Sequence, residues 1–101
     1  MKQIALITAI CCTVLACGQK KASSGTIADG KTVYKQNCVL CHGPNGKLGA
    51  NGSKDLTKST LSMDERVSII KNGKGAMIGL GNILTEDEIQ AAAQFTFDLQ
   101  K

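Results

Sequence analysis

The chain has 101 residues, of which 43% are hydrophobic, 20% charged and 3% aromatic, so it has room for one small domain and excludes a second. Its formal net charge of +4 comes from charges spread along the sequence, which argues against a nucleic-acid-binding protein. Eleven Gly, one Pro and no Trp leave little bulk for a core, and five Cys in so short a chain need an assignment.

Residues 1–16 have the layout of a secretory signal peptide, with a positive charge at Lys2 followed by an apolar run too short to span a bilayer. A Cys directly after Ala16 resembles the cleavage site of bacterial lipoprotein signal peptides. That resemblance implies that Cys17 is acylated and becomes the new N-terminus. An ordinary signal peptide cut near Ala16, or an uncleaved anchor, is the alternative. Residues 17–26 have no apolar period and are expected to form a flexible tether.

The first predicted element after the tether is a helix over residues 29–37, where Asp29 suits the positive end of the helix dipole. This helix leads directly into Cys38-Val39-Leu40-Cys41-His42. Residues 43–55 follow, and their many Gly and Asn residues predict repeated turns instead of a regular element.

Two capping boxes predict the starts of two further helices. Ser62 and Glu65 form the first, and that helix is expected to stop at Asn72-Gly73, where glycine allows a left-handed end. A glycine-rich loop over 73–83 leads to the second capping box. Thr85 and Glu88 form that box at the start of a final helix. Along this helix, residues at helical spacing form a largely apolar stripe: Ile89, Ala92, Ala93, Thr96 and Leu99. We find no alternating pattern typical of strands and therefore predict an all-α domain of three or more helices over residues 27–101.

The sequence Cys38-x-x-Cys41-His42 is the signature of covalent haem attachment, in which two thiols add to the haem vinyl groups and the imidazole binds the iron. The alternatives are weaker. A structural zinc site needs a fourth ligand, a thioredoxin-type dithiol needs a βαβ context, and a disulfide across two residues constrains the chain little. We predict one haem c held by Cys38 and Cys41, with His42 as an axial iron ligand.

The second axial ligand is expected to be a methionine, and outside the signal peptide only Met63 and Met77 are available. Met63 falls in the first turn of a predicted helix, where a hydrophobic contact explains it. Met77 lies among closely spaced glycines, which allow the backbone to approach a flat cofactor. We therefore predict Met77 as the ligand, with core filling as the alternative explanation for a methionine.

Three segments together resemble the class I monohaem cytochromes c, of the small bacterial lipoprotein type: residues 29–43, 69–77 and 84–89. The resemblance covers the chain from Thr26 onward. It implies several helices packed around one covalently bound haem, with the first and last helices crossing. It further implies that Gly30 and Tyr34 meet Ala92 and Phe95 at that crossing.

The sequence departs from this family in two places. Ile78 follows Met77, where the family often has Pro, so the loop is expected to be less rigid. The sole Pro, Pro44, is only two residues past His42, so the sequence does not name the carbonyl group that orients the His42 imidazole.

An iron with both axial positions filled has no open site for a substrate, which predicts an electron carrier and not an enzyme. The alternative is a haem-based gas binder or sensor, in which Met77 is labile or absent. A peroxidase is disfavoured, because the chain has one His and Arg66 has no evident reason to lie over the iron. Lys71 and Lys74 flank the start of the glycine-rich loop. We expect their charges either to attract an acidic partner or to be those of ordinary solvated lysines.

The expected partners are redox proteins such as a terminal oxidase, a reductase or a quinol-oxidising complex. We expect a monomer that is exported and held by lipid on Cys17 to a bacterial membrane, facing the periplasm or the cell exterior.

Overall fold

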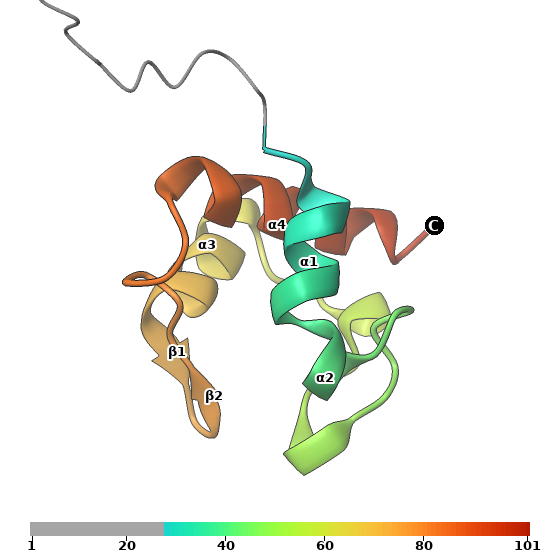
Figure 1. Cartoon of the computed structure of the whole chain (residues 1–101). Coiled ribbons are helices and arrows are strands. Elements are labelled where there is room, and N and C mark those ends of the chain that lie inside the picture. Colours follow the sequence, from blue (N-terminus) through green and yellow to red (C-terminus); the bar gives the residue numbers. More distant parts are fainter. Residues whose placement is uncertain (1–27) are drawn as a thin grey trace, which may run out of the picture.

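The computed structural model of this chain describes residues 28–101 (Figure 1). The predicted signal peptide, Cys17 and the predicted tether lie outside the described residues. The described part contains, in chain order, α1 (Gly30–Asn37), α2 (Val39–His42), the 3₁₀ turns η1 (Ala50–Gly52) and η2 (Leu56–Lys58), α3 (Met63–Asn72), the strands β1 (Gly73–Lys74) and β2 (Met77–Ile78), and α4 (Glu86–Asp98). Within residues 28–101, no helix combines the length and apolar character needed to cross a membrane.

Helices α1 and α4 cross in close contact, as predicted (Figure 1). Gly30 makes this approach possible, because a Cβ atom there would lie 2.1 Å from the carbonyl oxygen of Ala91. The Tyr34 and Phe95 rings pack beside the crossing with their centroids 5.0 Å apart. The residue nearest to Gly30 is thus Ala91 and not Ala92, which was predicted to meet Gly30 and Tyr34 at the crossing. Ala92 lies in the core at 1% exposure.

The predicted helix starts are confirmed by their capping hydrogen bonds. Asp29 is the N-cap of α1, where its carboxylate accepts from the Lys31 amide at 3.2 Å. Both capping boxes form at the predicted residues, one at the start of α3 and one at the start of α4. The end of α3 differs in detail: Gly73 has φ 79° but ψ 169°, so the chain leaves the helix into an extended strand and not through a left-handed turn.

The predicted loop over 73–83 contains a short hairpin, so the prediction that the domain has no strand is wrong here. Strands β1 and β2 are antiparallel, with Gly73 opposite Ile78 and Lys74 opposite Met77. Each strand has two residues, which is too short for an alternating apolar pattern to appear in the sequence. The rest of the described chain is helical or built of turns, which agrees with the predicted fold class.

The core lies between α1, α3 and α4. Its buried apolar side chains form one cluster, on which several half-buried side chains pack: Val33, Ile70, Leu80, Ile89, Ala92 and Ala93 form the cluster, and Met63, Val67, Met77 and Leu84 pack on it. The predicted stripe of α4 therefore faces the core. Two polar side chains are also buried, Arg66 at 5% and Thr96 at 7% exposure.

Candidate functional site

The Cys38–His42 segment is one turn of helix placed directly after α1. The Cys38 amide still donates to the Tyr34 carbonyl at 2.8 Å, and the His42 amide donates to the Cys38 carbonyl at 2.9 Å. Residues three apart in a helix share a face, so this turn presents Cys38 and Cys41 on the same side. The local hydrogen bonds thus give the two thiols a common direction.

Both thiols are free and half-buried. Burial, and secondarily the neighbouring Cys41, raises the pKa of Cys38 to about 11. The Cys38 thiol is therefore protonated at neutral pH, unlike the acidic, activated thiol of a disulfide oxidoreductase.

A backbone carbonyl orients the His42 imidazole. Its Nδ1 atom lies 3.1 Å from the carbonyl oxygen of Lys54. Because a carbonyl can only accept, the proton of a neutral imidazole sits on Nδ1 and the lone pair is left on Nε2. Lys54 is thus the acceptor that the sequence alone did not name.

The loop between His42 and Lys54 is folded by its own hydrogen bonds. The Leu48 amide donates to the His42 carbonyl at 3.0 Å, and the Leu56 amide donates to the Gly46 carbonyl at 2.9 Å. The buried Tyr34 hydroxyl donates to the Gly43 carbonyl at 2.6 Å, which ties the loop to α1. The predicted turns are confirmed, and they hold the Lys54 carbonyl beside His42.

Met77 lies on β2, half-buried against the core cluster. In Figure 1 the β1–β2 hairpin and α2 extend toward the same end of the molecule, on its two sides. Met63, the first residue of α3, also packs on the core, which is the structural role expected for it.

Exposed apolar side chains lie next to the candidate ligands in the sequence. Leu40, between the two cysteines, is 88% exposed, and Ile78, directly after Met77, is 71% exposed. The two predicted steering lysines differ from one another. The Lys71 ammonium lies 2.5 Å from the Glu86 carboxylate, so its charge is compensated, whereas Lys74 is exposed on β1.

Arg66 is an important residue whose position sequence reasoning missed. Its guanidinium donates to the Leu61 carbonyl at 2.9 Å and to the Thr96 hydroxyl at 2.8 Å. It also donates to the Ser59 carbonyl and the Gln100 side chain, each at 3.2 Å, and lies 3.7 Å above the centre of the Phe97 ring. Burial lowers the pKa of Arg66. The only sequence signal was its position four residues before Ile70, which places the two residues on one face of α3.

The donor set fits the predicted haem c. One helical turn offers two free thiols for the vinyl groups, and the adjacent imidazole keeps its Nε2 lone pair for iron. Met77, half-buried on β2, carries the thioether that the sequence predicts as the second iron ligand. Among residues 28–101, no three Cys, His, Asp or Glu side chains converge on a metal site of their own.

Comparisons with known proteins agree on one family. The family described as cytochrome C oxidase, cbb3-type, subunit III matches residues 25–95. Cytochrome c6 of Rippkaea orientalis is 36% identical over 80 residues, covering 73% of this chain and 71% of that protein. Chloroplastic cytochrome c6 of Chlamydomonas reinhardtii is 33% identical over 92 residues. That match covers 83% of this chain and 62% of the algal protein, less than two thirds of its length.

Solved structures give the same result. Cytochrome c6C from Synechococcus sp. PCC 7002 matches with a TM-score of 0.63 at 27% identity, covering 71% of this chain and 94% of that one. The KustC0563 c-type cytochrome matches with a TM-score of 0.66 at 23% identity, covering 72% of this chain and 99% of that one. The predicted fold class is therefore confirmed.

Proposed function

Because the chain belongs to the cytochrome c family and binds a covalently attached haem c, we propose that it is a single-electron carrier and not an enzyme. The haem supplies the reversible one-electron change between ferric and ferrous iron. The observation that supports the proposal best is the hydrogen bond from His42 Nδ1 to the Lys54 carbonyl, which keeps Nε2 free for the iron.

Four side chains have roles in this proposal. Cys38 and Cys41 form the thioether bonds, since they are free thiols on one helical turn. His42 and Met77 would hold the haem iron through Nε2 and the thioether sulfur. With both ligands supplied by the protein, no position would be left for a substrate, and the thioether would favour the ferrous state.

We expect contact with the redox partner near α2 and β2, where Leu40 and Ile78 are largely exposed. Redox pairs use small, short-lived interfaces, and exposed apolar side chains beside the cofactor suit such contacts. An acidic partner would meet Lys74 before Lys71, because Glu86 compensates Lys71. A terminal oxidase, a reductase or a quinol-oxidising complex fits this role.

Haem extraction tests the proposal directly. After acid–acetone treatment, wild-type protein is expected to keep its haem, because thioether bonds survive acid. The double variant Cys38→Ser, Cys41→Ser should release all of it. The wild type should also show a reversible one-electron reduction in its visible spectrum. A colourless wild-type polypeptide would contradict the proposal as a whole.

We also propose that Cys17 carries lipid and holds the domain at a membrane facing the periplasm or cell exterior. The support is the sequence around Ala16 and Cys17, and both residues lie outside the described part of the structure. Mass spectrometry of the mature N-terminus should find acyl chains on Cys17. The Cys17→Ser variant should leave the membrane fraction or fail to mature, and an unmodified N-terminus in the wild type would refute the anchor.

A further inference from the structure

The segment after Met77 lies directly against the end of α3. The Leu80 amide donates to the Ile70 carbonyl at 2.7 Å, and the Gly81 amide donates to the Lys71 carbonyl at 3.0 Å. We call this contact between residues 79–81 and 70–72 the α3 seam. The Leu80 side chain is buried in the core, so the seam has one apolar anchor.

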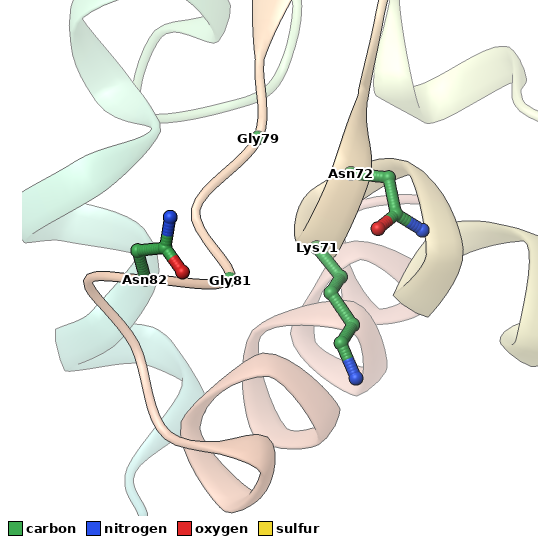
Figure 2. Close-up of a pocket in the computed structure, with 5 residues that line it drawn as sticks. All are labelled: Lys71, Asn72, Gly79, Gly81 and Asn82. Carbon is green, nitrogen blue, oxygen red and sulfur yellow. The ribbon is translucent and has the colours of Figure 1, made fainter.

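Gly79 and Gly81 of the α3 seam lie across from Lys71 and Asn72 at the end of α3 (Figure 2). A Cβ atom at Gly79 would lie 2.6 Å from both the Lys71 carbonyl oxygen and the Asn72 carbonyl carbon. At Gly81 it would lie 2.9 Å from the same oxygen and 3.0 Å from Cγ of Lys71. Carbon atoms do not approach backbone this closely, so a side chain at Gly79 has to push the segment away from α3.

A hollow of about 390 Å³ borders the α3 seam, and its lining is polar or glycine: Lys71, Asn72, Gly79, Gly81 and Asn82 (Figure 2). The segment is therefore fixed to α3 by the hydrogen bonds of the Leu80 and Gly81 amides and by the buried Leu80 side chain, and it can lie this close because Gly79 and Gly81 have no side chains.

A short stretch of backbone connects the α3 seam to Met77. Met77 is two residues before Gly79, on a strand that pairs with β1, and β1 directly continues α3. Only Ile78 lies between Met77 and Gly79, so we expect a backbone shift at Gly79 to displace β2. A group that binds a metal has to be held within about 0.5 Å of its productive position.

We infer that Gly79, and to a smaller extent Gly81, are positioning residues that set the place of the Met77 sulfur by letting β2 lie against the end of α3. This inference rests on the proposed role of Met77 as an iron ligand. Neither glycine touches the iron in this proposal, because each acts through the backbone.

The test compares Gly79→Ala with Gly75→Asn in the holoprotein. Gly75 is at the hairpin turn with φ 58°, where a Cβ meets nothing within 4 Å and Asn tolerates the conformation. For Gly79→Ala we expect amide exchange at Leu80 and Gly81 to rise about tenfold, which corresponds to about 1.4 kcal/mol. The near-red band of the oxidised protein, typical of methionine on ferric iron, should weaken, and carbon monoxide should bind the reduced form about tenfold faster. Gly75→Asn should match the wild type.

The outcomes separate this inference from the ligand assignment. A wild type without the near-red band contradicts Met77 ligation, and the positioning role falls with it. A wild type with the band, beside a Gly79→Ala protein that keeps it unchanged, overturns the positioning role alone. If Gly79→Ala does not fold, Gly81→Ala replaces it, since the flexible Lys71 stem can partly yield there. The expected result is then a smaller change of the same kind, and an unchanged band refutes the role.

Discussion

Replacing Met77 with Ala is expected to convert the protein from an electron carrier into a binder of small gases. Under the proposed ligation, the substitution removes the Met77 thioether on β2, so the iron would lack one of its two protein ligands. In the proposed carrier we expect the conformation without the Met77–iron bond to be a minor state of the wild type, populated at about 0.1–10% as in other two-state proteins. Because every Met77→Ala molecule can bind carbon monoxide at the iron, the apparent affinity for carbon monoxide should rise about 10- to 1000-fold. The reduction potential should fall, since the ligand that favours ferrous iron is lost.

The matched control is Met63→Leu. Met63 packs on the same core cluster from the first turn of α3, and leucine conserves most of its volume. We expect its spectrum, potential and carbon monoxide binding to equal those of the wild type, with a stability loss below about 1.5 kcal/mol. Spectroscopic titration with carbon monoxide makes the comparison. A wild type that is high-spin and binds carbon monoxide readily would favour a gas sensor over a carrier.

Replacing Arg66 with Ala should destabilise the domain by about 3 kcal/mol, in the range of substitutions that break a buried polar network. The guanidinium joins α3 to α4 through Thr96 and Gln100 and to the preceding loop through Ser59 and Leu61. Its stacking on Phe97 is lost as well. In a domain of this size the melting temperature should fall by roughly 12–24 °C.

Two further variants separate the causes of that loss. Arg66→Met keeps most of the apolar stem but has no donors for the Leu61 carbonyl, so it should recover only part of the stability. Lys58→Ala removes an exposed cation near the same loop and should change the free energy of unfolding by no more than about 0.5 kcal/mol. Denaturant unfolding followed by circular dichroism measures all three. Full recovery in Arg66→Met would show that the hydrogen bonds contribute nothing.

Local patterns were predictable because the residues that determine them are close in sequence. A capping box is complete within four residues, as Ser62 and Glu65 show. Cys38, Cys41 and His42 likewise share one helical turn, so their mutual placement follows from helix geometry. The crossing of α1 and α4 required the family resemblance, since Gly30 and Ala91 are far apart along the chain.

Other features depend on contacts that leave no pattern in the sequence. Every residue has a carbonyl group, so nothing at Lys54 indicates that its oxygen orients His42. An arginine on a helix is normally solvated, and the burial of Arg66 depends on Thr96 and Gln100, which come 30 and 34 residues later. The α3 seam is formed by backbone atoms and by glycines, whose closeness to α3 only the fold shows.

The crossing of α1 with α4 also determines when the domain can fold during synthesis. Its main scaffold pairs the first described helix with the last, so the α4 residues that cover Val33 and Tyr34 are made only after α2, the 3₁₀ turns, α3 and the hairpin. Local turns can form earlier, but contacts this distant in sequence must wait for the whole intervening chain. The newly made polypeptide therefore has no complete core until α4 has left the ribosome.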